Sequence, residues 1–128
     1  MKWFVTAILL LSVGFVFGFN DPSGLSKIDP VLVEAFKTQP EMEYLVIMKG
    51  KANVQNTVSF ASKEAKGTYV ATTLRSFADQ SQADIRLFLG KQKVEFKPYW
   101  VINAVKVRSN KALALLMAER SDVEKIVA

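Results

Sequence analysis

The sequence predicts an α+β fold, a ferredoxin-like βαββαβ unit with a four-stranded antiparallel sheet and two helices on one face. Strand-like patterns occur at residues 43–49, 93–108 and 123–127. Helix-like patterns lie between them, at residues 57–90 and 111–120. The middle pattern reads as two adjacent strands of a hairpin. The order is therefore strand, helix, strand, strand, helix, strand.

Composition bounds the chemistry of the chain. Its 128 residues, 50% of them hydrophobic, can bury one core without covalent cross-links. It holds no cysteine and no histidine, which excludes disulfides, thiolate nucleophiles, Ser-His-Asp triads and histidine metal ligands from this chain alone. We expect no enzymatic activity, no cofactor and no metal. The net charge of +5 is compatible with an anionic partner, although a weakly basic solvated surface is the commoner reason for it.

The N-terminus reads as a signal peptide over residues 1–18. A lysine follows Met1, residues 3–17 are almost entirely apolar, and we expect cleavage between Gly18 and Phe19. The apolar run is shorter than the roughly 20 residues that span a bilayer. We therefore expect a secreted, extracellular domain that meets the membrane only transiently.

Residues 19–42 are predicted to form a linker with one short helix, ahead of a folded domain at residues 43–128. Asp29 and Pro30 provide an N-cap and a first helical residue, and the helix should end near Thr38, before Pro40. This helix either packs on the edge of the domain or touches nothing, and the sequence leaves both alternatives open.

The first strand, at residues 43–49, is apolar on both faces. Tyr44, Val46 and Met48 share one face, while Leu45 and Ile47 share the other. Such a strand needs cover on both sides, yet the chain has helices for only one.

The long helical region at residues 57–90 has an apolar stripe on one face and polar residues opposite. A break is expected at Gly67-Thr68. A single helix of that length would measure about 50 Å, too long for a small sheet, so one part must overhang or fold back. The apolar stripe holds Leu74, Phe77, Ala78, Ile85, Phe88 and Leu89, and the polar face holds Arg75, Asp79, Gln82 and Arg86.

The hairpin at residues 93–107 is predicted to turn at Asn103-Ala104, because asparagine tolerates the left-handed backbone of a tight turn. This register places Val94, Phe96, Trp100 and Ile102 on the core face, opposite Val105 and Val107. The other face then carries Tyr99, Val101, Lys106 and Arg108.

The second helix, at residues 111–120, follows a cap at Ser109 or Asn110 and should bury Leu113, Leu116 and Met117. A last strand at residues 123–127 completes the sheet. With both helices on one face, the other sheet face is open and partly apolar, which is typical of an interface.

Three blocks of the chain together resemble a known family. They read EYLVIMKGKA, KVEFKPYWVINAVKVRSN and KALALLMAERSDVEKIVA. In this order they are similar to the inhibitor I9-type N-terminal propeptide of subtilisin-like serine proteases. The long helical insert and the segment YWVINA resemble the bacillopeptidase F-like branch. The resemblance covers residues 43–128.

The resemblance implies a ferredoxin-like unit that acts as an intramolecular chaperone and temporary inhibitor by docking its open sheet face on the protease domain. Carried over to this sequence, the docking face includes Tyr99, Val101, Lys106 and Arg108. Family members continue past the last strand into a tail that enters the active-site cleft, whereas this sequence stops at Ala128. The chain is thus expected to be the front of a longer precursor, with its protease in cis, or else a free-standing secreted inhibitor acting in trans.

Other features of the sequence indicate less. The pairs Ser26-Lys27 and Ser62-Lys63 are poor dyads, because adjacent residues do not face each other on a helix or strand. Nucleic-acid binding could use Tyr99 as a stacking platform beside the hairpin lysines. Predicted export, and the lack of an RNP-like glycine-aromatic signature, favour a protein partner and no nucleic acid. An exported adaptor domain unrelated to proteases is the third class of function.

Overall fold

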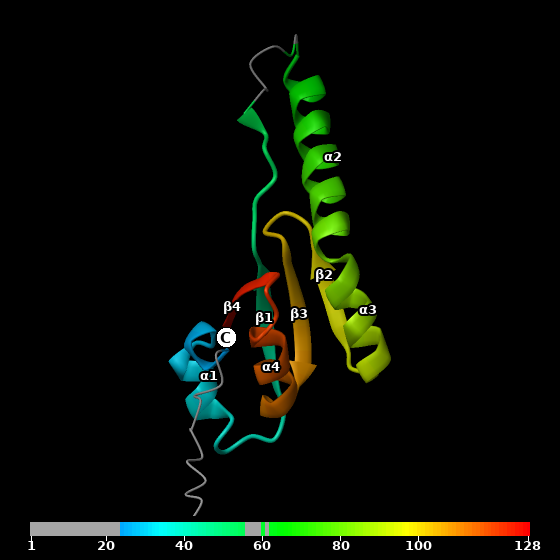
Figure 1. Ribbon diagram of the computed structural model, residues 1–128. Helices are drawn as coiled ribbons and strands as arrows, with labels where there is room; N and C mark the ends of the chain where they lie inside the picture. The colour runs from blue at the N-terminus through cyan, green and yellow to red at the C-terminus, as the bar shows by residue number, and fades with distance from the viewer. Residues whose placement is uncertain (1–23, 56–59, 61) are drawn as a thin grey trace, which may run out of the picture.

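The computed structural model describes residues 24–55, 60 and 62–128, so the predicted signal peptide and its cleavage site lie outside the described residues. Four strands form one antiparallel sheet in the order β2-β3-β1-β4 (Figure 1). The elements are η1 (Leu25–Lys27), α1 (Pro30–Ala35), β1 (Met42–Met48), α2 (Lys63–Ser81), α3 (Ala83–Gln92), β2 (Phe96–Tyr99), β3 (Ala104–Ser109), α4 (Lys111–Ala118) and β4 (Val123–Val127). This topology confirms the predicted ferredoxin-like α+β fold.

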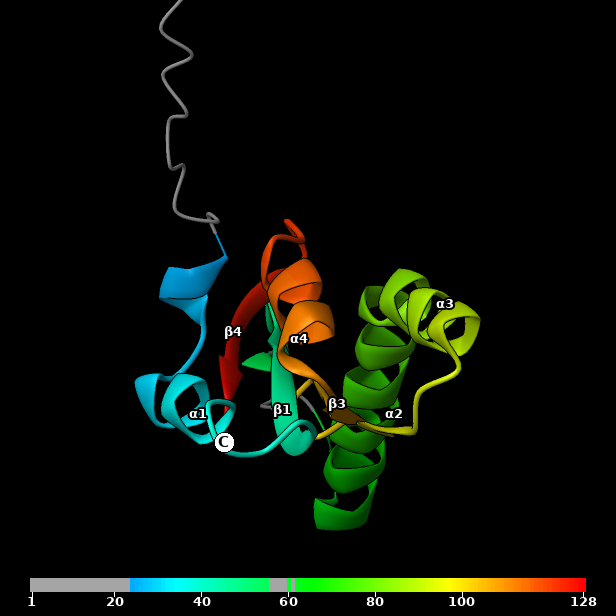
Figure 2. The same ribbon diagram turned by 90° about the horizontal axis from the view of Figure 1, so that it is seen from below.

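One face of the sheet, the inner face, carries the core. Tyr44, Val46 and Met48 point to this face from the central strand β1 and are fully or almost fully buried, as their alternation predicts. Buried side chains of α3 and α4 pack on them, and Figure 2 shows both helices on the same side of the sheet. The helical and neighbouring-strand members of the core are Ile85, Leu89, Leu113, Met117, Val105, Val107, Val123 and Ile126.

The helical region between β1 and β2 is divided at Gln82 rather than at Gly67-Thr68. Helix α2 continues through Gly67, where the cost of glycine in a helix is only on the order of 1 kcal/mol. Of the two predicted alternatives, overhang and folding back, the structure shows the overhang: α2 extends beyond the end of the sheet (Figure 1), and residues 62–68 are all exposed.

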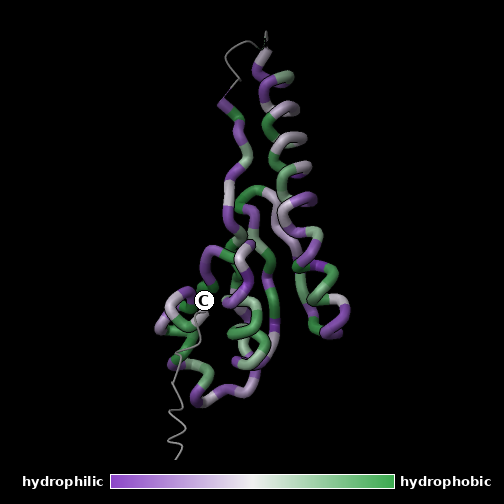
Figure 3. Tube along the Cα trace, in the orientation of Figure 1, coloured by the Kyte–Doolittle hydropathy of each residue, from purple (hydrophilic) through white to green (hydrophobic). Residues whose placement is uncertain are grey.

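Helix α4 is rotated about its axis relative to the prediction. Leu113 and Met117 are buried as expected, together with Ala114 and Ala118, whereas Leu116 is 53% exposed. The helix face that contacts the sheet is formed by two adjacent rows of residues, 113 with 117 and 114 with 118. Residue 116 therefore points to solvent. In Figure 3, α4 and the strands beside it are mainly hydrophobic, while hydrophilic and hydrophobic residues alternate along α2.

The segment before β1 belongs to the same core. The Asp29 side chain caps α1 by accepting a hydrogen bond from the Val31 N–H at 3.0 Å. Leu32 of α1 is fully buried, and Ile28 pairs with Ile126 of β4 as an isolated parallel bridge. Of the two alternatives that the sequence left open, the helix therefore packs on the edge of the domain.

Lys27 reinforces this attachment. Its ammonium group donates hydrogen bonds to the carbonyls of Arg120 (3.1 Å) and Val123 (2.9 Å), at the turn between α4 and β4. Gly24 lies so close to the end of α4 that a Cβ there would be 2.8 Å from the backbone of Ala118 and Glu119.

In the part of the chain that the structure describes, no helix is long and apolar enough to cross a membrane.

Candidate docking surface

The face of the sheet opposite the core, called the outer face here, is apolar at its centre. Leu45 and Ile47 of β1 point to it and are only half-buried. Val127 of β4 is the cross-strand neighbour of Leu45, so the apolar centre extends to the sheet edge. A half-buried apolar centre on a sheet is typical of a surface that meets another protein.

Charged side chains surround this centre. Lys106 lies opposite Leu45 on β3, and its Nζ is 2.6 Å from Oε1 of Glu43. The hydrogen bond from Lys106 lowers the pKa of the Glu43 carboxyl, and the same bond raises the pKa of the Lys106 ammonium. Arg108 Nε is 3.8 Å from Oε2 of Glu41, a looser pair. Such exposed pairs contribute little to stability but set the local charge.

The β2 side of the outer face carries an aromatic ring with a lysine beside it. Tyr99 is half-buried, and the ammonium of Lys97 lies 5.5 Å from the centre of its ring. Lys125 occupies the outer face of β4, beside Ile47, and is exposed. The apolar centre is therefore bordered by cations on both edges of the sheet.

Three of the four predicted docking residues, Tyr99, Lys106 and Arg108, lie on the outer face. Val101 does not, because β2 ends at Tyr99 and residues 100–103 form a four-residue loop. Tyr99 pairs with Ala104, so the predicted two-residue turn and its register are wrong. Asn103 does adopt the left-handed backbone, with φ of 46°. Val101 lies at the end of the sheet, 62% exposed.

The same change of register moves two predicted core residues. Ile102 is 54% exposed, and Trp100 is only half-buried, with the Arg75 guanidinium 4.6 Å from its ring centre. Phe96, by contrast, pairs with Val107 and packs on the core as predicted. The predicted two-residue turn continued strand alternation through Trp100 and Ile102 and so placed them on the core face, but the four-residue loop releases them from that alternation.

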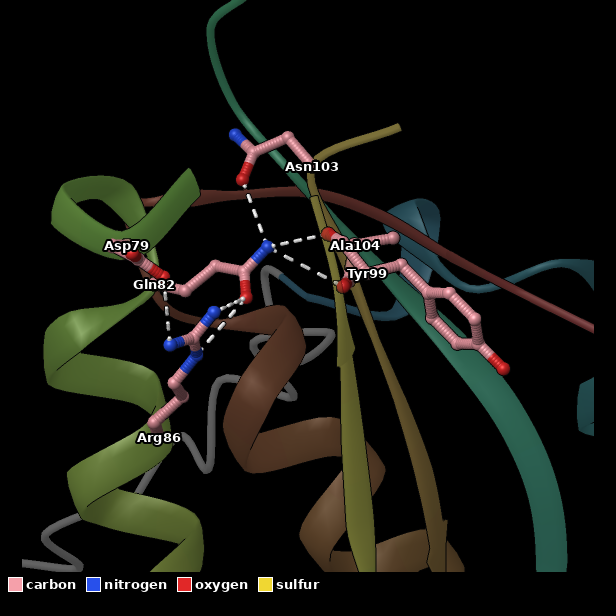
Figure 4. Close-up of polar contacts among 6 residues, drawn as sticks. All are labelled: Asp79, Gln82, Arg86, Tyr99, Asn103 and Ala104. Atoms are coloured by element: carbon pink, nitrogen blue, oxygen red, sulfur yellow. Dashed lines mark hydrogen bonds and ion pairs between the residues drawn. The ribbon is translucent and has the colours of Figure 1, made fainter. Parts of the chain in front are cut away.

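A buried polar residue was missed by the sequence interpretation, which placed Gln82 on the polar face of a helix. Gln82, the residue that joins α2 and α3, is fully buried, and Figure 4 shows its polar contacts. Its Nε2 donates to the carbonyl of Tyr99 at 2.9 Å and to Oδ1 of Asn103 at 3.0 Å. Its Oε1 accepts two hydrogen bonds from Arg86, at 2.7 and 3.1 Å. The sequence signal was present, since residues 78, 82, 85 and 89 share one helical stripe.

An open groove lies between the loop at residues 100–103 and the middle of α2. Its volume is about 370 Å³, and its lining is mainly apolar. The two β1 residues in its lining are Ile47, from the outer face, and Met48, from the inner face, so the groove lies at the end of the sheet and adjoins the outer face at Ile47. Its apolar lining also includes Leu74, Phe77, Trp100, Val101 and Ile102.

Comparison with known proteins finds similarity to Bacillopeptidase F of Bacillus subtilis (strain 168). The two are 26% identical over 120 aligned residues, which cover 80% of this chain and 8% of that protein. The chain thus spans less than a tenth of the relative's length. No family model matches the chain, and no solved structure matches it. The chain is therefore similar to part of a subtilisin-like protease, which agrees with the predicted resemblance at the level of the protease class.

Proposed function

We propose that this chain is a propeptide domain that binds a subtilisin-like protease domain through its outer face, assists folding of that domain and inhibits it temporarily. The observation that carries the proposal is the apolar centre of the outer face, Leu45, Ile47 and Val127, which is bordered by cations and only half-buried. The similarity to part of Bacillopeptidase F supplies the class of partner.

The proposed chaperone activity is a population shift. A surface that binds the folded protease domain better than its unfolded forms stabilises the folded state by the difference in binding free energy. When the concentration of the propeptide domain is one hundred times its Kd, the folded protease domain is stabilised by about 2.7 kcal/mol. No catalytic group of this chain is required, in keeping with the absence of histidine from its sequence. We expect the domain to be secreted, with residues 1–18 as its signal peptide.

The proposal is tested by titrating the purified chain against a bacterial subtilisin-like protease, following direct binding and hydrolysis of a chromogenic peptide. We expect saturable binding that Leu45→Asp weakens at least about tenfold, because a carboxylate would have to be desolvated at the centre of the interface. Tyr99→Ala should weaken binding less, at the edge of the face.

A matched control is Leu87→Asp, which introduces the same change on α3, where Leu87 is 63% exposed. It should bind like the unsubstituted chain. Refolding of the denatured protease domain with and without the chain tests the chaperone activity, and a higher yield is expected with it. Absence of binding to several such proteases, or equal loss in both variants, would contradict docking through the outer face.

The runner-up is a free-standing inhibitor that uses the same face in trans. Such an inhibitor would use the same binding face as the propeptide, but it would not be covalently connected to the protease domain. An open reading frame that continues beyond residue 128 into a protease domain supports the propeptide, and a stop codon supports the inhibitor.

A further inference from the structure

The loop at residues 100–103 exposes apolar side chains at the end of the sheet. Val101 is 62% and Ile102 is 54% exposed, and the two are consecutive. Single exposed apolar residues are ordinary on a protein surface, but adjacent ones beside an apolar groove are typical of a contact site. The groove has Ile47 of the outer face in its lining, so the loop adjoins the outer face through this residue.

The loop is held from beneath by buried polar contacts. Gln82 Nε2 bonds to Asn103 Oδ1 at 3.0 Å and to the carbonyls of Tyr99 and Ala104 at 2.9 and 3.4 Å (Figure 4). Asn103 Nδ2 donates to Ser81 Oγ at 3.1 Å. Both ends of the loop are thereby tied to the junction of α2 and α3.

A loop held in this way loses little conformational freedom when a partner covers it. Ordering a mobile side chain at an interface costs about 0.5 to 1.5 kcal/mol, and preorganisation removes part of that cost. Asn103 also accepts a backbone hydrogen bond from the Met48 N–H at 3.0 Å, which ties the loop to β1. The tips of Val101 and Ile102 are thus presented in a defined place, next to an opening that can receive a side chain.

The charge around the loop indicates the kind of surface that fits it. The Arg75 guanidinium lies over Trp100 at one side, and exposed Lys97 and Lys125 border the outer face. A partner that covers both must offer an apolar patch with carboxylates around it. A second copy of this chain would bring these cations together, which disfavours self-association through the same face.

We propose that Val101 and Ile102 form an apolar anchor for the protease domain that covers the outer face, and that Gln82 is the positioning residue for this anchor. The proposal rests on the proposed function and adds to it a specific contact at the end of the sheet. In the bound state the anchor meets an apolar patch of the protease domain, and one apolar side chain of that patch enters the groove beside Phe77.

The test is a double-mutant cycle on the dissociation constant for a bacterial subtilisin-like protease. The first change is Val101→Ser with Ile102→Ser, which removes the apolar tips and leaves the Gln82 contacts in place. We expect about tenfold to hundredfold weaker binding, the size of effect that loss of two partly buried aliphatic contacts gives. The matched control is Leu87→Ser with Leu116→Ser on the helical side, which should leave binding unchanged.

The second change is Gln82→Met, or the milder Asn103→Gly, which keeps the left-handed backbone and removes the side-chain amide. Either should weaken binding several-fold in the presence of Val101 and Ile102 and have little further effect once both are serine. A purely structural role for Gln82 would give the same cost in both backgrounds. Equal costs would overturn the positioning role.

The two proposals fail in different ways. If the unsubstituted chain binds and Leu45→Asp weakens it, while the serine variant binds equally well, the anchor is wrong and the docking face stands. If the unsubstituted chain binds no protease of this class, both proposals are overturned. Should Gln82→Met not fold, Asn103→Gly and the serine variant decide the question.

Discussion

At the scale of single residues, the structure depends on a few polar groups placed inside an apolar core. Gln82 is fully buried, and in the described part of the chain no buried side-chain nitrogen or oxygen lacks a hydrogen-bond partner. Tyr44 is the second case: Ser109 donates to the Asn110 carbonyl, so the Tyr44 hydroxyl donates to Ser109. Both residues connect segments that are distant in the sequence. Removal of the Gln82 amide takes a donor from the carbonyls of Tyr99 and Ala104, whereas removal of the Tyr44 hydroxyl leaves Ser109 with its bond to the Asn110 carbonyl alone.

Gln82→Met is expected to lower the free energy of unfolding by about 2 to 3 kcal/mol, because the carbonyls of Tyr99 and Ala104 and the guanidinium of Arg86 lose their partner. Urea denaturation measures this. The control is Gln80→Met on the exposed face of α2, which should change stability by less than about 0.5 kcal/mol. Equal stability of the two variants would contradict the network in Figure 4.

Tyr44 gives a prediction for alkaline pH. Burial raises the pKa of its hydroxyl to about 12, against an ordinary value of 10. Because the folded state holds the proton more tightly, this contribution to stability is complete below pH 10 and is lost as the pH rises towards 12. The loss should reach about 2 to 3 kcal/mol. Denaturation curves of the unsubstituted chain and Tyr44→Phe, measured from pH 9 to 12, should converge by that amount, and parallel curves would contradict it.

At the scale of elements, the fold depends on how segments dock rather than on how they form. Capping makes α1 and α4 locally stable: Asp29 accepts from the Val31 N–H, and Asn110 accepts from the Leu113 N–H at 3.0 Å. Docking of η1 and α1 on the sheet edge needs Gly24 against the end of α4. Edge strand β2 tolerates Pro98, since a strand at a sheet edge has one side without ladder partners.

Gly24→Ala is expected to destabilise the domain by about 1 to 3 kcal/mol, because the added methyl group would press on the backbone at Ala118 and Glu119. Gly67→Ala is the opposite control. No atom lies within 4 Å of its Cβ position on α2, so alanine should stabilise the helix by about 0.5 to 1 kcal/mol. Thermal unfolding of both variants is the measurement. A neutral Gly24→Ala would contradict the close packing of the segment before β1.

At the scale of the whole molecule, the two faces of the sheet differ in how they are covered. The inner face is closed by α3 and α4, and the outer face keeps its apolar centre half-buried. Helix α2 continues past the sheet and, with the loop at residues 100–103, lines a groove that adjoins the outer face at Ile47. The molecule therefore presents a surface that is apolar at its centre and basic at its edges.

The basic edges predict a salt dependence of the proposed protease complex. Raising the ionic strength from 50 to 500 mM should weaken binding roughly threefold to tenfold, because rim charges are screened. Lys97→Glu with Lys125→Glu should remove this dependence, and Lys91→Glu on α3 should not. Salt-independent binding by the unsubstituted chain would contradict an acidic border on the partner surface.

The sequence by itself determined the order of the elements, the two faces of β1 and the cap at Asp29, and it narrowed the cap of α4 to Ser109 or Asn110, of which the structure has Asn110. Those features depend on residues one to four positions apart, where alternation, periodicity and capping act directly. The last strand, Val123–Val127, was predicted with its observed bounds for the same reason.

Only the tertiary structure decided the hairpin register, the burial of Gln82 and the docking of α1. Each depends on contacts between distant segments: Ala104 pairs with both Tyr99 and Ile47, and Gln82 satisfies carbonyls some twenty residues away. Local patterns cannot rank such pairings, because the free energy that selects them comes from filling one shared core and pairing every buried polar group within it.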